Sequence, residues 1–514
     1  MERGPRKEPQ KRSPVSLQAR QPPEGITGKK KYMKNNDRYK RLVQFGSAAV
    51  IMAVHVVLYY AVWTFHLNRI IEMPFWYRGN FLLAGVYGAL LLLLHQLYGG
   101  LKIGVLRRNN IIYSQILALT AVNVFAYVEL VLIDKKMHSA VPFLLLMAAD
   151  VLVTVLWAYL FQWIYNLVFP PRELLVVYGD RPVFKILEKI NSRDDKYVLT
   201  GAMNLDKGVD SIMAAVPNYQ GIVIGDIPSH ERNMILKRCY DLDMRVYMIP
   251  KISDIMIRTS SDLQLFDTPI LLSRNEGLQV DQAFFKRVLD IVSASTLLLL
   301  FSPLFLIFAA AIKAEDRGPV FYTQTRLTKD GKLFRILKFR TMRTDAEKDG
   351  VARLAGEHDD RITKTGKILR ATRLDELPQM LNILKGDMSM VGPRPERPEI
   401  AAEYEKEIPE FRMRLKVKAG LTGFAQIYGL YNTTPYDKLK LDLTYIRNYS
   451  IFLDLKLIFM TPKIMFMKES TAGVEEGQVT ASLREEVYGK PVVYEEEIKK
   501  NQGRRKRKKG GRKQ

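Results

Sequence analysis

The chain has 514 residues, 47% of them hydrophobic, which excludes both a small single module and an intrinsically disordered chain. The formal net charge of +24 indicates an anionic partner such as nucleic acid or a membrane surface. However, residues 1–41 carry +9 and residues 499–514 carry +10, so only about +5 is left for the rest, and we expect no nucleic-acid binding. The single cysteine, Cys239, excludes an intrachain disulfide and a cysteine-based metal site.

Four long stretches without Asp, Glu, Lys or Arg follow the basic arm of residues 1–41. These stretches are 44–68, 79–101, 109–128 and 151–171. A helix needs about 20 residues to cross the hydrocarbon core of a bilayer, and a soluble protein rarely buries four such stretches in one region. The sequence therefore predicts a bundle of four transmembrane helices over 42–171. We expect the arm to stay attached, since it lacks the cleavage pattern of a signal peptide.

The distribution of Lys and Arg predicts the orientation of the bundle. The basic arm and the basic loop 102–108 are expected in the cytoplasm, so that the chain returns there at Arg172. Glu129 and Asp150 then fall near the outer interface, where a charge reaches water cheaply. Interfacial placement is favoured for both over a proton relay.

Short β-branched runs alternate with helical stretches over 172–275. The predicted strands are 174–178, 221–225 and 245–249, and the predicted helices are 184–191 and 229–240. This alternation is typical of a small open parallel sheet, here a Rossmann-like α/β domain. The first strand is followed by Gly179 alone, without the G-x-G-x-x-G pattern of a dinucleotide site. We therefore favour an assembly or regulatory module and leave nucleotide binding open.

An apolar segment at 284–312 is long enough to span a membrane but has basic residues at both ends. The positive-inside rule places both ends on the same side. Ser302 and Pro303 lie in its middle, where proline breaks a helix and a serine hydroxyl satisfies a freed carbonyl. The sequence predicts a re-entrant membrane helix that turns at these two residues. The alternative is a kinked fifth span.

Two strands, 320–327 and 332–340, alternate around Lys329-Asp330-Gly331 and predict a hairpin. Lys338 and Arg340 are two residues apart and face the same way, an arrangement that suits a phosphate or a headgroup. The alternative is a solvated basic strand face.

The acidic dipeptide Asp375-Glu376 precedes a short predicted helix. Pro378 fits the first turn of that helix and Gly386 its end, which makes Asp375 the predicted N-cap. In a functional interpretation, a carboxylate beside a helix N-terminus and near Arg370 lies where phosphate oxygens bind. Consecutive helical residues point about 100° apart, so the two acids would differ in role. One could attack phosphorus while the other holds a divalent cation.

Two prolines flank Arg394 in the run Gly392-Pro393-Arg394-Pro395. A guanidinium on a nearly rigid backbone is a good bidentate phosphate ligand, and a structural turn is the equal alternative.

In combination, these motifs resemble the bacterial sugar transferase family, the monotopic phosphoglycosyl transferases that start glycan assembly on a polyprenyl carrier. The resemblance runs from Phe285 to about Phe466 and rests on ordered motifs: Phe285-Lys286-Arg287 through Asp290, Ser302-Pro303, Gly318-Pro319-Val320-Phe321, Lys338-Phe339-Arg340-Thr341-Met342, Asp375-Glu376-Leu377-Pro378-Gln379, Gly392-Pro393-Arg394-Pro395 and Lys418-Ala419-Gly420-Leu421-Thr422-Gly423. Arg373 departs from the small polar residue expected two positions before Asp375. The four spans and the α/β domain look like the large membrane form, the polyprenyl-phosphate hexose-1-phosphate transferases of capsule, exopolysaccharide and O-antigen pathways.

The resemblance implies a two-step transfer. Asp375 would attack the β-phosphorus of a UDP-hexose and release UMP, and the phosphate of the polyprenyl (undecaprenyl) carrier would then take the phosphosugar from the carboxylate. Glu376 would bind Mg²⁺, and Arg370 would orient the acidic pair. The implied phosphate or sugar contacts are Lys338, Arg340, Arg394 and Asp442.

The resemblance also implies a bacterial inner-membrane protein, multi-pass, whose catalytic domain at 313–470 lies on the cytoplasmic face. A C-terminal extension with a basic tail follows at 471–514. The helical stretches 436–445 and 451–466 either seat the catalytic domain on the leaflet or are ordinary core helices. The organisation is compatible with a homodimer.

Two other functions stay open from the sequence. One is a non-catalytic membrane regulatory protein whose basic tails bind acidic polymer or lipid. The other is a conventional glycosyltransferase, which would release UDP.

Overall fold

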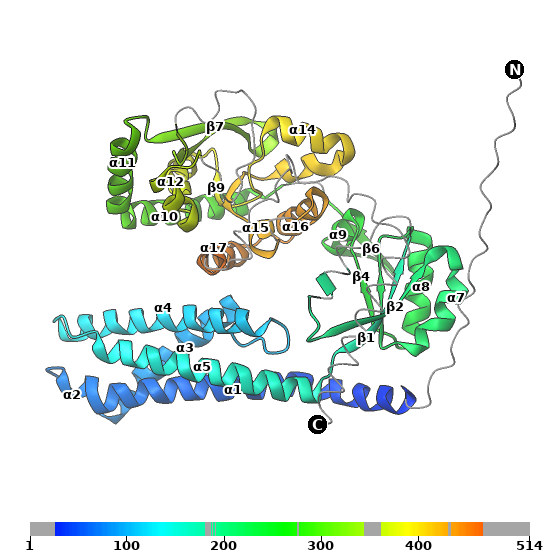
Figure 1. The fold of residues 1–514 in the computed structure, drawn as a ribbon, viewed down its shortest axis with the longest axis horizontal. Coiled ribbons are helices and arrows are strands. Elements are labelled where there is room, and N and C mark those ends of the chain that lie inside the picture. Colours follow the sequence, from blue (N-terminus) through cyan, green and yellow to red (C-terminus); the bar gives the residue numbers. More distant parts are fainter. Residues whose placement is uncertain are drawn as a thin grey trace, which may run out of the picture.

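The computed structural model describes residues 26–179, 187, 189–190, 192–274, 277–343, 361–429 and 433–465. The first 25 residues of the basic arm and the predicted extension 471–514 lie outside the described residues. The described chain forms a helical bundle, an α/β domain at one end of the bundle, and a helix-rich region beside it (Figure 1).

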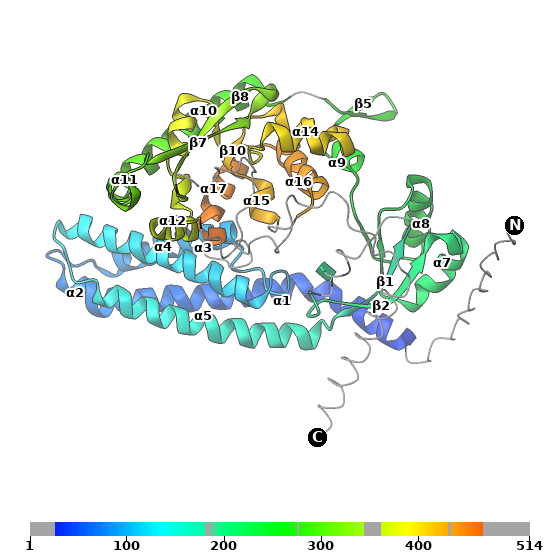
Figure 2. The same cartoon turned by 45° about the horizontal axis from the view of Figure 1, so that its top comes forward.

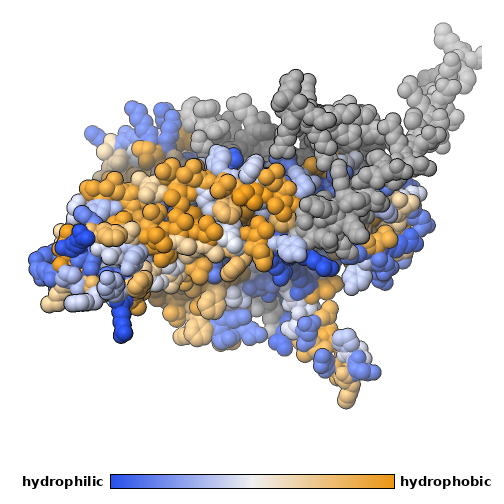
Figure 3. Space-filling view, turned by 90° about the horizontal axis from the view of Figure 1, so that it is seen from below, coloured by the Kyte–Doolittle hydropathy of each residue, from blue (hydrophilic) through white to orange (hydrophobic). Residues whose placement is uncertain are grey.

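Four helices in the first part of the chain are long and apolar enough to cross a membrane, as predicted. Their apolar spans are Arg38–Ile70, Tyr77–Tyr98, Arg108–Asp134 and Val141–Val168. The first comprises most of α1 (Ile26–Val62), a π-helical turn (Trp63–Leu67) and α2 (Asn68–Ile70), and the others are α3, α4 and α5. Apolar side chains cover much of the outer face of this bundle (Figure 3).

Asp150 does not lie at the outer interface, and that part of the sequence interpretation is wrong. It is the tenth residue of α5 and is fully buried, with its Oδ1 2.8 Å from Nδ1 of the equally buried His55 on α1. Its Oδ2 accepts a 3.1 Å hydrogen bond from Asn123 on α4, which itself accepts one from Tyr87 on α3. The carboxyl group of Asp150 is therefore bound by polar side chains of other helices rather than by water, as is usual for an acid inside a membrane bundle.

A four-stranded parallel sheet follows the bundle, with the strand order β2-β1-β3-β4. The strands are β1 (Arg172–Tyr178), β2 (Tyr197–Asn204), β3 (Gly221–Ile224) and β4 (Val246–Met248). The helical elements are η2 (Leu205–Lys207), α7 (Val209–Ala215), η3 (Val216–Asn218), α8 (Ser229–Asp241) and α9 (Ile252–Arg258). The predicted open parallel sheet is present, but the prediction missed β2, whose Gly201 and Ala202 interrupt the β-branched pattern. Most of the predicted helix 184–191 lies outside the described residues.

The segment after the α/β domain contains the predicted helix break. An antiparallel hairpin of β5 (Ser261–Leu265) and β6 (Thr268–Leu272) leads to α10 (Val280–Leu300) and α11 (Ser302–Asp316), which are bent by 62° relative to each other. Ser302 Oγ donates a 2.8 Å hydrogen bond to the Leu299 carbonyl, and Pro303 lies in the first turn of α11. The serine thus satisfies a carbonyl at the break, as predicted.

The helix-rich region is built from short elements around a main hydrophobic core and two smaller hydrophobic clusters. They are β7 (Phe321–Leu327), η4 (Lys329–Gly331), β8 (Leu333–Phe339), α12 (Lys364–Thr372), η5 (Leu374–Glu376), α13 (Gln379–Lys385), β9 (Ser389–Val391), α14 (Pro398–Glu407), η6 (Pro409–Lys416), β10 (Gly420–Thr422), α15 (Phe424–Tyr428), α16 (Pro435–Arg447) and α17 (Ile451–Met465). Strands β7 and β8 form the predicted antiparallel hairpin, and the parallel pair β9 and β10 carries the segment before Arg394.

Helix α17 joins the helix-rich region to the bundle (Figure 2). Leu457 and Met460 lie in the core of the region, and Lys463 Nζ donates a 3.1 Å hydrogen bond to the Tyr98 carbonyl at the end of α3. Phe452 is 79% exposed, so the helix also presents an apolar side chain outward. Helix α9 of the α/β domain packs on α16 in a shared hydrophobic core. The helix-rich region therefore contacts the α/β domain as well as the bundle.

Candidate active site

The site begins with the attachment of α13 to the hairpin. Asn382 lies on the buried face of α13, where its Oδ1 accepts from the Leu337 amide at 2.9 Å and its Nδ2 donates to the Arg335 carbonyl at 2.8 Å. Arg287 of α10 donates to the carbonyls of Ile383 and Leu384 at the other end of α13. These contacts fix the short helix, and with it the acidic residues just before it, against β8. Asn382 could not be identified from the sequence, because its hydrogen bonds to the backbone of β8 leave no local pattern.

Asp375 and Glu376 lie in the 3-10 turn η5, which the predicted N-cap role of Asp375 did not anticipate. Helix α12 ends at Thr372 and is followed by Arg373, a non-glycine residue in the left-handed conformation with φ of 54°. The separate turn η5 begins after Arg373. Pro378 occupies the N-cap position of α13, without a side-chain capping hydrogen bond. The Asp375 carboxylate therefore does not cap α13. Gly386 ends α13 in the left-handed conformation, as predicted.

Two cations hold the carboxylate of Glu376. Lys338 Nζ donates to Glu376 Oε1 at 2.7 Å, and Arg394 Nη2 lies 3.3 Å from the same oxygen. Burial by itself would raise the pKa of Glu376, but Lys338 and Arg394 outweigh it and hold that pKa far below its usual range. Glu376 is therefore ionised throughout the physiological pH range.

Asp375 has the opposite electrostatic environment. Burial, followed by the negative charge of Glu376, raises the pKa of Asp375 to about 6, against the opposing effect of Lys338, Arg370 and Arg394. An acid with this pKa is mostly ionised at neutral pH and remains a strong enough base to act as a nucleophile. The two neighbouring carboxylates thus differ in pKa, as expected for groups that have different roles.

Arg370 is fixed beside this pair from α12. Its Nε donates a 2.9 Å hydrogen bond to Thr341 Oγ1 at the end of the hairpin. Gly366, one turn earlier in α12, allows the approach, because a Cβ there would lie 2.1 Å from the Thr341 carbonyl. The contact orients the guanidinium near Asp375.

Arg394 is held by its backbone, as the two flanking prolines suggested. The carbonyls of three consecutive residues accept hydrogen bonds: Pro393 from the Gly420 amide at 2.9 Å, Arg394 from Arg414 at 3.0 Å and Pro395 from Arg326 at 3.1 Å. The side chain of Arg394 remains 48% exposed and points to Glu376. A rigid backbone with an exposed guanidinium is well suited to bind phosphate.

Close backbone packing explains the glycines on both sides of this segment. A Cβ on Gly392 would lie 2.3 Å from the Lys418 carbonyl, and one on Gly420 would lie 2.0 Å from the Gly392 amide nitrogen. Neither position has room for a side chain.

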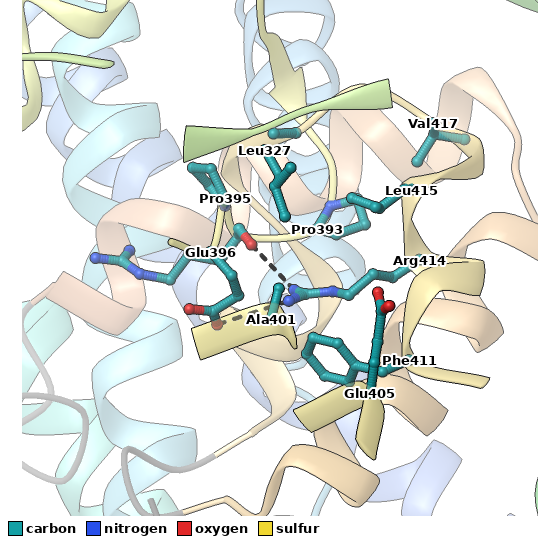
Figure 4. A pocket seen from close by; sticks show the side chains of 12 residues that line it. Leu327, Pro393, Pro395, Glu396, Ala401, Glu405, Phe411, Arg414, Leu415 and Val417 are labelled. Atoms are coloured by element: carbon teal, nitrogen blue, oxygen red, sulfur yellow. Dashed lines mark hydrogen bonds and ion pairs between the residues drawn. The ribbon is translucent and has the colours of Figure 1, made fainter. Parts of the chain in front are cut away.

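Asp442 lies in a buried ion pair rather than at an open surface. Its carboxylate is 2.8 Å from Arg414, both side chains are almost fully buried, and Arg414 also pairs with Glu396 at 3.6 Å. Figure 4 shows Arg414 reaching between Glu396 and Phe411 in the wall of a small pocket, which Arg394 also lines. Asp442 therefore supports Arg414, which in turn holds the backbone of Arg394, an arrangement that the predicted sugar or nucleotide contact did not include.

Arg340 diverges from Lys338 despite their spacing. It is buried and forms a bidentate ion pair with Asp316 at the end of α11, whereas Lys338 reaches Glu376. Arg340 therefore ties the hairpin to the bent helix pair, and of the two predicted phosphate ligands only Lys338 lies at the acidic pair.

The beginning of α10 is held deep inside the helix-rich region. Lys286 Nζ donates to the Val391 carbonyl at 2.8 Å and to Asp454 at 2.6 Å, and Asp290 accepts from Ser389 and from the Met390 amide. Lys286 thus does more than mark a charged flank of the apolar segment. It anchors the bent helix pair to the strand before Arg394.

The donor set at the acidic pair fits one hard divalent cation. Among the described residues no group of three or more His, Cys, Asp and Glu is placed to hold a metal. Mg²⁺, however, is usually bound by one or two carboxylates together with substrate phosphates and water. Glu376 supplies such a carboxylate, and a cation beside it would offset the negative charge that, after burial, raises the pKa of Asp375.

Comparison with known proteins extends these observations. The family described as bacterial sugar transferase matches residues 281–468. The chain is 39% identical over 244 residues to the UDP-glucose:undecaprenyl-phosphate glucose-1-phosphate transferase of Klebsiella pneumoniae, covering 46% of this chain and 52% of that protein. It is 45% identical over 181 residues to a protein of the same name from Caulobacter vibrioides, covering 34% of this chain and 67% of the relative.

A third relative is covered almost completely. The exopolysaccharide production protein PSS of Rhizobium leguminosarum bv. phaseoli is 42% identical over 185 residues, which are 34% of this chain and 92% of that protein. Against longer relatives such as the Klebsiella protein, the match spans about half of their length. The similarity therefore centres on the region that carries Asp375, Glu376 and Arg394.

Proposed function

The chain belongs to the bacterial sugar transferase family, and we propose that it transfers a hexose 1-phosphate from a UDP-hexose to a membrane polyprenyl phosphate with release of UMP. The observation that carries this proposal is the pair of neighbouring carboxylates with different pKa values, surrounded by Lys338, Arg370 and Arg394. Anionic phosphates need such cations, and a phosphoryl transfer through the protein needs a nucleophile.

In the first step, an ionised Asp375 oxygen attacks the β-phosphorus of the donor. A bond forms between that oxygen and phosphorus, the bond to the oxygen of the α-phosphate breaks, and UMP leaves. In the second step, an oxygen of the polyprenyl phosphate attacks the same phosphorus and the bond to Asp375 breaks. The product is a polyprenyl diphosphate hexose, and the carboxylate is regenerated.

The surrounding side chains position the phosphates. Arg394, with its clamped backbone and exposed guanidinium, binds the nucleotide phosphates. Lys338 holds Glu376 and adds positive charge to the site, and Arg370 orients Asp375. Glu376, together with donor phosphate oxygens, would hold Mg²⁺. When bound, the cation would supply charge neutralisation for the developing pyrophosphate oxygens.

The membrane arrangement is part of the proposal. The positive charge of the basic arm and of the loop 102–108 supports an active site on the cytoplasmic face of the bacterial inner membrane. The 62° bend between α10 and α11 fits a re-entrant helix that enters and leaves by one leaflet. This arrangement brings a water-soluble donor and a membrane-bound acceptor to one site. One relative is named an exopolysaccharide production protein, and we propose that this chain initiates the assembly of such a polysaccharide.

The test is UMP release by full-length protein in lipid nanodiscs with Mg²⁺ and undecaprenyl phosphate. The donors are UDP-glucose, UDP-galactose and UDP-N-acetylgalactosamine, since relatives carry names that include each of these sugars or sugar classes. We expect UMP from at least one donor, its loss in Asp375→Asn, and its retention in Asp387→Asn, a nearby acid outside the site. Release of UDP would instead show a conventional glycosyltransferase, and the absence of any nucleotide product would favour a regulatory protein.

A further inference from the structure

A second pocket lies at the end of the bundle where the chain passes into the α/β domain. It is open to solvent. Its walls include Lys40 of α1, Tyr165 and Phe169 at the end of α5, and Arg172, Lys196 and Tyr197 of the α/β domain. None of these residues belongs to the active site.

The pocket is strongly cationic. Three of its lining side chains are basic, namely Lys40, Arg172 and Lys196. The lining acid Asp195 is held by two 2.8 Å hydrogen bonds from Arg193, so its negative charge is already compensated. Burial, followed by the positive charge of Arg193, lowers the pKa of Lys196 to about 8, and Lys40 and Arg172 act in the same direction. Burial is the main cause of this shift, and the neighbouring positive charges add to it against the opposing charge of Asp195.

Hydrogen bonds connect the basic side chains on this side of the pocket to the loop between α3 and α4 of the bundle. Lys196 Nζ and Arg193 Nη1 both donate to the Val105 carbonyl, at 2.7 and 3.0 Å, in the loop between α3 and α4. Arg107 of the same loop donates to the Ser192 carbonyl at 2.8 Å. Each ammonium group has three donors, so Lys196 can bind an anion while it keeps this contact. Lys196 is therefore held in place before any ligand binds.

The surroundings of the pocket match the headgroup level of a bilayer. The rings of Tyr165 and Phe169 lie 4.9 Å apart at the end of the apolar helix α5, and Lys40 lies 5.9 Å above the Tyr165 ring. Aromatic rings and snorkelling basic side chains at helix ends are typical of the membrane interface. Exposed apolar side chains lie on the bundle within a few residues of the pocket lining: Leu42 and Phe45 follow Lys40, and Leu167 precedes Phe169. An acyl chain can lie along these residues, whereas a free anion would make no apolar contact with them.

From this geometry we propose that the pocket is a binding site for the phosphate headgroup of an anionic membrane lipid, with the acyl chains lying along α1 and α5. The site is separate from the donor and acceptor chemistry at Asp375. Basic pockets at the cytoplasmic ends of membrane helices bind anionic headgroups in this way. Binding here would hold the α/β domain against the membrane end of the bundle, because Lys40 and Lys196 belong to these two parts.

The test is native mass spectrometry of the full-length protein released from detergent with one of three probes. The probes are 1-palmitoyl-2-oleoyl phosphatidylglycerol, the matching phosphatidylcholine and inorganic phosphate. We expect retained phosphatidylglycerol, little phosphatidylcholine, and a reduction of phosphatidylglycerol binding by about tenfold or more in Arg172→Gln/Lys196→Met. Lys196→Arg should keep the binding, since it keeps the charge. Lys237→Gln, on the exposed face of α8, is the matched control.

Thermal unfolding and UMP release are measured on the same variants, so that a misfolded variant is recognised. Equal retention of phosphatidylglycerol by the double variant, or equal retention of phosphatidylcholine by the unaltered protein, would overturn the proposal. Retention of inorganic phosphate with the same dependence on Arg172 and Lys196, without preference for the lipid, would overturn it in favour of a soluble anion. If the double variant unfolds, loss of lipid in Arg172→Gln alone, with binding retained in Arg172→Lys, decides the matter.

Discussion

The ammonium group of Lys338 donates a 2.7 Å hydrogen bond to Oε1 of Glu376, which ties strand β8 to the second acid of the pair. The same charge also lowers the pKa of the neighbouring Asp375, although burial and Glu376 raise that pKa to about 6 in total. Through Lys338, the hairpin therefore lowers the pKa of the proposed nucleophile Asp375 and also holds the carboxylate of Glu376.

The first prediction concerns pH. Because Asp375 must be ionised to attack phosphorus, UMP release should fall as the pH drops through about 6. In Lys338→Met the inflection should move to higher pH, since removal of a nearby cation raises the pKa of Asp375. The pH profile of kcat/KM for the donor, measured between pH 5 and 8, tests both statements. Lys332→Met, on the exposed start of the hairpin, should leave the inflection unchanged.

The second prediction separates two roles of Asp442. If the ion pair with Arg414 is its main contact, Arg414→Met should destabilise the protein by about 3–5 kcal/mol, because it leaves a buried carboxylate unpaired. Asp442→Asn should cost less stability and should leave the KM for the donor nearly unchanged. Urea unfolding and donor kinetics measure these effects. A large rise in KM at unchanged stability would instead make Asp442 a substrate contact.

The third prediction concerns the attachment of α13. Asn382→Leu removes both hydrogen bonds to β8 and leaves the Leu337 amide and the Arg335 carbonyl without their partner. Each such group costs about 1–3 kcal/mol, so a loss of about 2–6 kcal/mol is expected, with a fall in UMP release. Asn448→Ala, which removes an exposed contact at the end of α16, is the control and should change little.

The fourth prediction concerns the polar cluster inside the bundle. His55→Leu or Asp150→Leu should each lower the thermal stability in nanodiscs, because the other partner is left buried. The double variant should be more stable than the sum of the two single effects predicts. Additive losses in this double-mutant cycle would mean that the 2.8 Å contact contributes no coupling.

The fifth prediction concerns topology. In a Cys239→Ser background, Glu399→Cys on the helix-rich region should react with a membrane-impermeant maleimide only after the cells are permeabilised. Ser139→Cys, in the exposed loop between α4 and α5, should react in intact cells. Labelling of Glu399→Cys in intact cells would place the helix-rich region outside and identify the bent helix pair as a fifth span.

Local sequence patterns determined several of the elements. Four uncharged runs predicted the apolar helices, Ser302-Pro303 predicted the break between α10 and α11, and Gly386 predicted the end of α13. Each of these features depends on residues close in sequence: on a run of apolar side chains, on the missing amide of proline, or on the left-handed conformation of glycine. The order of the motifs along the chain also predicted Asp375, Glu376 and Arg394 as site residues.

The partners of the charged groups were decided only by the tertiary structure. Arg340 pairs with Asp316, Arg414 with Asp442 and His55 with Asp150, across separations of 24, 28 and 95 residues. A basic residue on a strand has the same local pattern whether it faces a phosphate or a distant carboxylate, so spacing alone could not distinguish Lys338 from Arg340. Burial makes an unpaired charge costly, and the fold satisfies that cost by bringing together side chains from elements that are far apart in the chain.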